Sequence, residues 1–279
     1  MRTHECVSIR RCAEAASLGS GACFALRMQK VAADIMRTTG AAEKVGGIEV
    51  SAFESLTACA RCILEDARTA RGGFAVAINA EKVISSFQDR TLRELIGRAT
   101  LRYADGAGVV VALRLKGTRT VRVPGADLWL EILREARSER LPIALIGASP
   151  HVLATTLRRL AAEFPHVDAV VARDGYEGAR DPDTVLDALR QTRPEIVFVA
   201  MGSPRQERLI EHLRCGYPQA FYLGLGGSFD VYCGSKRRAP RWMQRAGLEW
   251  LFRFLSEPSR APRETKRLRF LLLLAAGRL

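Results

Sequence analysis

One pattern repeats along most of the chain: a short apolar run, followed by a longer segment with apolar residues at helical spacing. The runs predict strands over residues 74–78, 101–103, 142–146, 167–172, 195–200 and 220–223. The segments between them predict helices over residues 81–98, 126–138, 151–164, 183–191 and 206–214. Strands joined through helices pair in parallel, and the helices cover both faces of the sheet. The sequence therefore predicts an α/β fold with a Rossmann-like, mostly parallel sheet.

This pattern is confined to the middle of the chain. Residues 1–45 are rich in Ala, Arg and Ser without clear periodicity, which predicts a poorly ordered or loosely helical extension. Residues 46–234 carry the α/β pattern. Residues 235–279 show no strand pattern, and Pro258 and Pro262 interrupt their helical stretches. We therefore expect an α/β domain followed by a helical segment, residues 235–279, which we call the appendage.

The appendage carries most of the positive charge. It holds twelve Lys and Arg side chains against three glutamates, a net charge of +9, whereas the whole chain has a formal net charge of +13. Basic segments bind nucleic acid, an anionic membrane surface or a polyphosphate ligand. Aromatic residues lie among these cations, and one helical face is shared by Leu268, Leu271, Leu272, Ala275 and Leu279. This predicts either an interfacial helix on a membrane or a solvated basic face.

Composition gives no sign of export. No apolar run approaches the roughly 18 residues that a membrane span needs, and basic residues interrupt the apolar stretches of the N-terminus. Seven cysteines, an odd number, fit a reducing compartment better than a disulfide framework. Cys59 and Cys62 have CxxC spacing without a second ligand pair, so we expect two thiols on one helix turn. A cytoplasmic protein, peripheral to a membrane, is predicted.

Polar or glycine-rich loops follow three predicted strands, where open α/β sheets bind their ligands. Asp105 follows the strand over residues 101–103, and its carboxylate can act as a base if it is partly desolvated. The loop with Gly202 opens a helix, whose first N–H groups attract anions. The loop with Gly226 and Gly227 lets the backbone approach a ligand closely.

These residues also have structural interpretations. Asp105 before a glycine suits a helix N-cap or an Asx turn, and Ser203 before Pro204 suits an ordinary helix start. Asp181 and Asp183 have the DxD spacing that holds a divalent cation in many sugar-nucleotide enzymes, but the intervening proline favours Asp181 as a helix N-cap. The histidines are scattered. We expect neither a metal nor a cofactor.

Five motifs follow in one order: Ala104-Asp105-Gly106, residues 202–207, residues 226–230, Arg238-Ala239-Pro240 and residues 247–253. Together they resemble the WecG/TagA/CpsF family of bacterial glycosyltransferases, over about two thirds of the chain, residues 74–263. The resemblance implies an inverting, metal-independent transfer in surface polysaccharide synthesis. N-acetylmannosamine, or its uronic acid, would move from a UDP-sugar to a polyprenyl-diphosphate-linked N-acetylglucosamine.

The resemblance also implies roles for individual residues. The general base falls on Asp105, and Gln206 matches a glutamine that holds the donor or orients the reacting groups. Asn79 matches the asparagine of an early Thr-x-Asn motif, in which Ala77 replaces the threonine. The expected substrate-binding residues also include loop glycines and appendage arginines: Gly202, Gly226, Gly227, Arg238, Arg253, Arg260 and Arg263.

The partners expected from this resemblance are the UDP-sugar donor, the polyprenyl-diphosphate-linked acceptor and, through the appendage, the anionic inner face of the plasma membrane. Assembly into a homo-oligomer stays open. A nucleic-acid-binding protein would need basic residues spread over a face, whereas here they cluster at one end beside aromatics. A dinucleotide-dependent oxidoreductase would need GxGxxG after its first strand, and the sequence has none there. We therefore expect no nucleic-acid partner.

Overall fold

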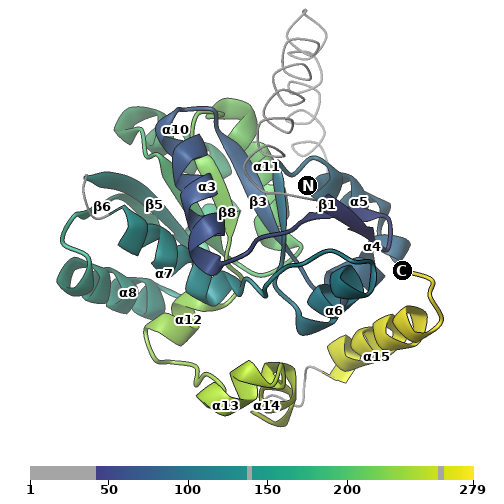
Figure 1. Cartoon of the computed structure of the whole chain (residues 1–279). Helices are drawn as coiled ribbons and strands as arrows, with labels where there is room; N and C mark the ends of the chain where they lie inside the picture. Colours follow the sequence, from purple (N-terminus) through teal and green to yellow (C-terminus); the bar gives the residue numbers. More distant parts are fainter. Residues whose placement is uncertain (1–41, 137–139, 257–260) are drawn as a thin grey trace, which may run out of the picture.

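A computed structural model describes residues 42–136, 140–256 and 261–279 (Figure 1). Within these ranges one sheet contains eight strands: β1 (Ala42–Val45), β2 (Ile48–Ser51), β3 (Gly73–Ile78), β4 (Leu101–Ala104), β5 (Leu141–Gly147), β6 (Val167–Arg173), β7 (Ile196–Ala200) and β8 (Phe221–Gly224). The strand order is β1-β2-β4-β3-β8-β7-β5-β6. Strands β1 and β2 pair antiparallel, and the other neighbours pair in parallel. The predicted α/β fold is confirmed.

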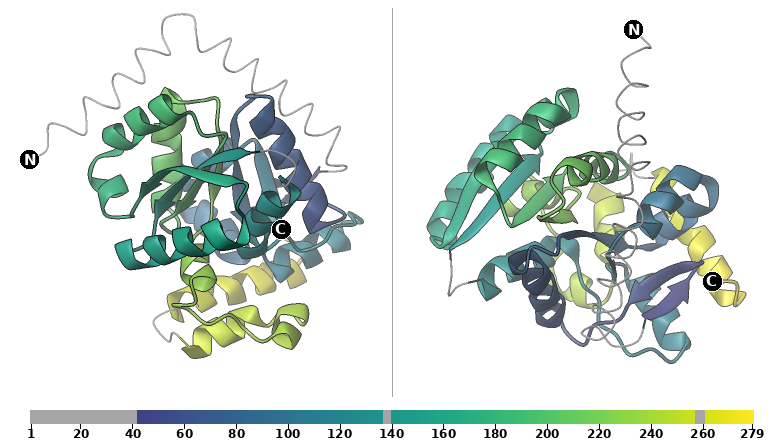
Figure 2. Two further views of the ribbon diagram at one scale, coloured as in Figure 1. Left: turned by 90° about the vertical axis from the view of Figure 1, so that its left-hand side faces the viewer. Right: turned by 90° about the horizontal axis from the view of Figure 1, so that it is seen from above.

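Helices cover both faces of the sheet (Figure 2). One face is covered by α3 (Leu56–Arg68), α7 (Gly125–Glu135), α8 (Pro150–Glu163) and α12 (Ser228–Tyr232). The other is covered by α4 (Ala80–Gln88), α5 (Arg90–Gly97), α6 (Ala107–Leu115), α10 (Pro182–Thr192) and α11 (Arg205–Gly216). A short helix, α9 (Glu177–Arg180), follows β6.

Two apolar cores result, one on each face. On β7, Ile196 and Phe198 belong to the core beneath α3 and α7, whereas Val197 and Val199 belong to the core beneath α10 and α11. Successive side chains of a strand point to opposite faces, so a strand covered on both sides is apolar at every position. This explains why the central strands appear in the sequence as unbroken apolar runs.

The first sheet edge differs from the prediction. Strand β1 lies within residues assigned to the N-terminal extension, and β2 lies before the first predicted strand, which begins at residue 74. Gly46 and Gly47 join them in a two-residue turn with φ of 59° and 76°, which L side chains rarely adopt. The rest of the predicted extension, residues 1–41, lies outside the described residues.

The helix predicted over residues 81–98 is two helices. Asp89 separates α4 from α5, and its Oδ1 accepts a hydrogen bond from the N–H of Leu92 at 2.9 Å, which caps α5. Phe87, near the end of α4, is exposed. The other predicted helices and strands end within three residues of their expected bounds.

The appendage contains three described helices: α13 (Arg241–Arg245), α14 (Glu249–Ser256) and α15 (Ala261–Ala275). They lie together below the sheet in Figure 1 and on the same side in the left view of Figure 2. Pro240 precedes α13, and Pro262 lies in the first turn of α15, where proline is tolerated. Pro258 lies outside the described residues. None of the described helices is long and apolar enough to cross a membrane.

Helix α15 joins the core of the α/β domain through one of its faces. The Phe270 ring is fully buried in the core that covers the α4 side of the sheet, and Leu273 and Leu274 pack against the same core. The ring lies close to Gly108, where a Cβ atom would be 3.1 Å from Phe270 Cε1, a tight contact. The appendage is therefore attached to the domain by apolar packing as well as by the chain.

The opposite face of α15 is exposed. Leu268, Leu271 and Leu272 are 60%, 47% and 64% exposed, at the spacing of one helical face. Leu272 follows the buried Phe270 by two residues, which places it about half a turn away around the helix. Three leucines of the predicted stripe are therefore exposed, but Leu279 follows the end of α15 and packs against the domain core, so the stripe is shorter than predicted.

Phe270→Ala should lower the free energy of unfolding by about 3–5 kcal/mol, because it leaves a cavity where α15 packs on the domain. Leu272→Ala, on the exposed face of the same helix, should change it by less than about 0.5 kcal/mol. Urea unfolding followed by tryptophan fluorescence measures both. Equal losses in the two variants would contradict the packing described for α15.

Candidate active site

A cavity of about 2100 Å³ opens at the carboxyl ends of the strands. It is lined by the loops that follow β4, β3, β8 and β7, four neighbours in the sheet, and by residues of α14 and α15. Ligands of open α/β sheets bind at such an edge. The cavity brings together seven of the residues predicted from the sequence: Asn79, Asp105, Gly202, Gln206, Gly226, Gly227 and Arg263.

Asp105 is half-buried at the cavity wall, directly after β4. Its N–H donates to the carbonyl of Ile78 at the end of β3 at 3.0 Å, which fixes the loop against the neighbouring strand. The N-cap of α6 is Gly106, and the described structure shows no side-chain cap there. The N-cap interpretation of Asp105 is therefore wrong. Burial first, and then the charge of Asp105, raise the pKa of the neighbouring Tyr103 phenol well above its usual value.

Asn79 follows β3 and caps α4, because its Oδ1 accepts a hydrogen bond from the N–H of Lys82 at 2.9 Å. A Cβ atom on Gly106 would lie 3.2 Å from Asn79 Cα, so the loop of Asp105 and the loop of Asn79 touch. The amide NH₂ of Asn79 is the group that can donate to a ligand. Ala77, also at the cavity wall, presents a methyl group where the resemblance has a threonine hydroxyl.

Gln206 is buried, and both ends of its amide bond within the protein. Its Oε1 accepts a hydrogen bond from the N–H of Gly226 at 2.8 Å, and its Nε2 donates to Glu207 Oε1 at 3.1 Å. Gly224 passes so close that an added Cβ would lie 2.5 Å from Gln206 Nε2. Gln206 therefore ties the loop after β8 to the start of α11. This geometry suits a residue that orients the groups of the site.

Helix α11 begins at the cavity with Arg205. Its N-cap is Pro204, so the prediction that Ser203 caps this helix is wrong. Gly202 has φ of 76°, which lets the chain leave β7 and turn into the helix. The first N–H groups of α11 therefore lie at the cavity edge, where they can attract an anion.

A buried ion pair links α4 to α11. Lys82 Nζ lies 2.8 Å from Glu207 Oε1, and the two side chains are 8% and 2% exposed. Burial alone would raise the pKa of Glu207, but the charge of Lys82 and the hydrogen bonds from Lys82 and Gln206 outweigh it and lower this pKa. Sequence reasoning missed the pair, because a lysine in a helix is usually exposed.

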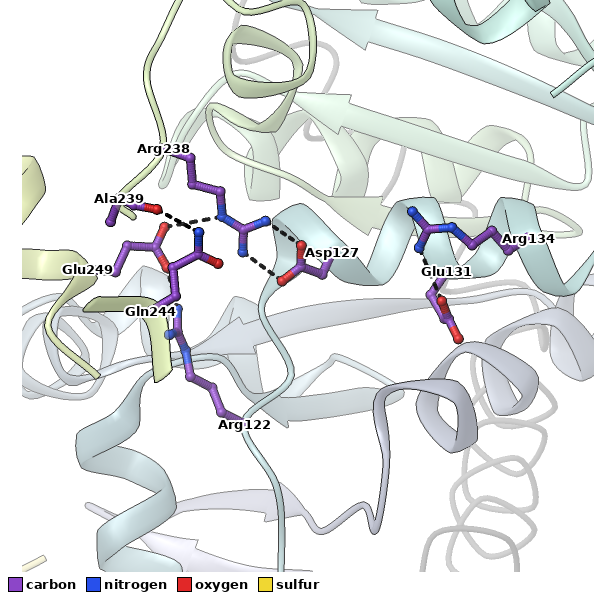
Figure 3. A network of polar contacts seen from close by, with 8 residues as sticks. All are labelled: Arg122, Asp127, Glu131, Arg134, Arg238, Ala239, Gln244 and Glu249. Carbon is purple, nitrogen blue, oxygen red and sulfur yellow. Dashed lines mark hydrogen bonds and ion pairs between the residues drawn. The ribbon is translucent and has the colours of Figure 1, made fainter. Parts of the chain in front are cut away.

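Arg238 connects the appendage to α7 (Figure 3). Its guanidinium makes a bidentate contact with Asp127, with 2.6 Å from Nη2 to Oδ2, and its Nε lies 3.8 Å from Glu249 Oε1. Asp127 lies in the first turn of α7, and Glu249 is the first residue of α14. The guanidinium is thus bonded to protein carboxylates, and the substrate contact expected for Arg238 stays a prediction.

Arg122 lies beside this pair and contacts the Asp105 loop directly. Its Nε donates to the Asp105 carbonyl oxygen at 2.7 Å, and its Nη2 donates to Glu249 Oε2 at 2.8 Å. One guanidinium therefore joins the loop of the candidate base to the appendage. Sequence reasoning missed Arg122 and Asp127, and it gave Glu249 no role although this residue lies within one of the recognised motifs.

The predicted arginines of the appendage differ in their position relative to the cavity. Arg263 lines the cavity, with its Nε 3.5 Å from Glu81 Oε1 on α4. Arg253 lies on α14, and Arg260 lies outside the described residues. Two further cations of α15 line the cavity: Lys266, which donates to Ser85 Oγ at 2.8 Å, and Arg267, which lies over the Trp250 ring.

The carboxylates and thiols considered as metal ligands are explained by helix capping, a contact with histidine and burial. Asp181 caps α10, as predicted, by accepting a hydrogen bond from the N–H of Thr184 at 3.1 Å, and Asp183 Oδ1 lies 3.0 Å from His212 Nε2. Burial raises the pKa of the Cys62 thiol to about 12. Across the described ranges, no group of three or more His, Cys, Asp or Glu side chains is arranged to hold a metal ion.

Fold and site together define an α/β protein with a ligand cavity at the carboxyl edge of its sheet, walled by a carboxylate, glycine loops and cations. The family model described as the glycosyl transferase WecG/TagA/CpsF family matches residues 43–279, and the chain belongs to this family. It is a glycosyltransferase of polysaccharide biosynthesis. The match extends beyond residues 74–263 at both ends and takes in β2 and α15.

Glu207→Gln should make the free energy of unfolding depend less on pH in the acid range. The pKa of Glu207 is lower in the folded protein than in the unfolded chain, where it is about 4.3. The ionised carboxylate therefore stabilises the fold above that value, and this contribution is lost as the pH falls through the folded pKa. Below about pH 5 the wild type should lose stability more steeply than the variant, by up to about 1.4 kcal/mol per pH unit.

Urea unfolding across this pH range measures the difference in slope. Glu94→Gln removes a carboxylate from an exposed ion pair on α5 and is the matched control. If the wild type and Glu207→Gln lost stability in parallel, Lys82 would not be holding the charge of Glu207.

Proposed function

We propose that this glycosyltransferase moves an N-acetylhexosamine of the N-acetylmannosamine type from a UDP-sugar to a polyprenyl-diphosphate-linked N-acetylglucosamine, with inversion. The observation that carries the proposal is the position of Asp105. Its carboxylate is half-buried at the carboxyl end of β4, in a cavity with several cations in its walls. Family membership supplies the reaction class, and the motif resemblance supplies the donor and the acceptor.

Asp105 acts as the general base in this reaction. It accepts the proton of the acceptor hydroxyl while that oxygen forms a bond to the anomeric carbon of the donor. The bond from this carbon to the UDP oxygen breaks, and UDP leaves with the electron pair. Attack opposite the leaving group inverts the anomeric configuration. General base catalysis of this kind contributes about 10²–10⁴-fold to the rate.

Cations of the cavity wall balance the charge of the leaving diphosphate. Arg263, Lys266 and Arg267 line the cavity from α15, and Arg205 lines it at the start of α11. Guanidinium groups and helix N-termini stabilise phosphate oxygens, so they can do what a divalent cation does in other transferases. The lipid-linked acceptor has a diphosphate of its own, and the same cations suit it.

Helix α15 supports a peripheral place on the cytoplasmic face of the plasma membrane, where a polyprenyl-linked acceptor is embedded. Its exposed leucines form an apolar stripe, and Arg263 and Arg269 on the same helix are exposed cations. An amphipathic helix of this kind lies in the interface of a bilayer. Each cation near an anionic leaflet contributes about 1 kcal/mol to binding.

Asp105→Asn should lower kcat by about 10²–10⁴-fold, because the amide cannot take the proton of the acceptor hydroxyl. The fold and the affinity for UDP should stay close to the wild type. Transfer of radiolabel from UDP-N-acetylmannosamine to a polyprenyl-diphosphate N-acetylglucosamine measures kcat. Asp187→Asn, exposed on α10, is the matched control. A variant with wild-type kcat would exclude Asp105 as the base.

Leu271→Glu together with Leu272→Glu should abolish binding to anionic vesicles without unfolding the protein. The reason is that both side chains are exposed and the new charges would have to enter the bilayer interface. Co-sedimentation with vesicles of phosphatidylglycerol measures binding. Leu115→Glu, at an exposed leucine of α6, should bind like the wild type. Unchanged sedimentation of the double variant would place the membrane contact elsewhere.

A further inference from the structure

Glu249 is a buried carboxylate between two guanidinium groups. It belongs to the appendage, whereas Arg122 precedes α7 and Asp127, the second partner of Arg238, lies in the first turn of that helix. Figure 3 shows the Glu249 side chain pointing toward both arginines. Each guanidinium thus has one partner in the α/β domain and shares Glu249 as the other.

The partner of Arg122 in the domain is the backbone of the candidate base itself. The Nε of Arg122 donates to the Asp105 carbonyl oxygen at 2.7 Å, and the N–H of Val123 donates to the Ala104 carbonyl at 2.8 Å. The segment around Arg122 therefore runs along the end of β4 and holds the Asp105 loop from one side. The N–H of Asp105, bonded to Ile78 on β3, holds it from the other.

Two further contacts bring the appendage to the same loop. Gly247 approaches Ala107 so closely that a Cβ atom on Gly247 would lie 3.1 Å from the Ala107 Cβ. The Phe270 ring contacts Gly108, as described above. Positions 107 and 108 follow Asp105 by two and three residues. The appendage therefore contacts the first two residues of α6 directly and reaches the Asp105 loop through Arg122.

Glu249 is the carboxylate that the two guanidinium groups share. Charges of Asp127, Glu249 and Asp105 all act on Arg238, so the Asp105 carboxylate lies within the electrostatic reach of this side chain. If Glu249 were neutral, both arginines would lose the carboxylate that they share. Arg238 would keep its bidentate contact with Asp127, whereas the Asp105 loop would lose its link to the appendage through Arg122.

We propose that Glu249 is a positioning residue for Asp105: through Arg122, which bonds both Glu249 and the Asp105 carbonyl oxygen, it fixes the backbone of the base. The base is then correctly positioned only when the appendage is docked on the domain. The kinetic part of this inference rests on the proposed function, because it takes Asp105 as the base.

Hydrogen exchange tests the structural part without any substrate. In the full-length Glu249→Gln protein, the amides of residues 105–108 should exchange several-fold faster than in the wild type, because the loop loses its contact through Arg122. Exchange in the strands β5 and β7 should not change. The matched control is Glu94→Gln, and Arg122→Gln breaks the same contact from its other end if Glu249→Gln does not fold. Unchanged exchange at residues 105–108 in both variants would overturn the proposal.

Kinetics test whether this positioning acts on the base. Glu249→Gln should lower kcat about 10–100-fold, as expected for a small misplacement of a catalytic group, with the KM for UDP-N-acetylmannosamine changed less than twofold. The same substitution in an Asp105→Asn background should have little further effect, because the base is already absent. An equal loss of kcat in both backgrounds would show that Glu249 acts independently of Asp105 and overturn the proposal.

The two experiments separate this inference from the proposed function. If the wild type transferred no sugar from this donor while exchange at residues 105–108 still rose in Glu249→Gln, the donor assignment would fail and the coupling would stand. If the wild type were active and Glu249→Gln matched it in both exchange and kcat, the coupling would fail and the proposed function would stand.

Discussion

Strands β4, β3, β8 and β7 lie side by side with helices packed on both faces, so a ligand reaches their backbone only at the strand ends. This burial decides the position of every group at the cavity. The loops after these four strands must leave the sheet at one edge, and the same edge receives the appendage. Residues far apart in the chain, such as Asn79 and Gln206, meet there because their strands are neighbours or nearly so.

Buried polar contacts then fix the loops against one another. Gln206 holds Gly226, Lys82 pairs with Glu207, and Arg122 holds the Asp105 carbonyl. A buried ion or amide without a partner is strongly unfavourable, so each contact favours a single arrangement of its loop. The cavity is thereby preorganised, and preorganised groups stabilise developing charge without first having to move.

The sequence predicted those parts of the structure that depend on local pattern. Apolar runs located the central strands, and strand ends located Asp105, Gly202 and the glycines of the third loop. The Gly46–Gly47 turn carried a local signal that was overlooked, and Asp89 interrupts a helix whose apolar spacing continues across it. The network around Glu249 could not be predicted this way, because Arg122 and Glu249 are 127 positions apart and Asp127 and Arg238 are 111 apart. No periodicity relates such pairs.

The two faces of α15 also determine how the enzyme would be oriented on a membrane. Phe270 is held in the domain core while Leu272 points outward and Leu271 borders the cavity, so the helix cannot roll without exposing its aromatic ring. With its leucines in the bilayer interface, the helix would lie flat, and the cavity that it lines would open just above the headgroups. The acceptor sugar would then have to reach across about one helix diameter, roughly 10 Å, from the headgroups to the cavity. The sugar of a lipid-linked acceptor could then enter the cavity while its polyprenyl chain stays in the membrane.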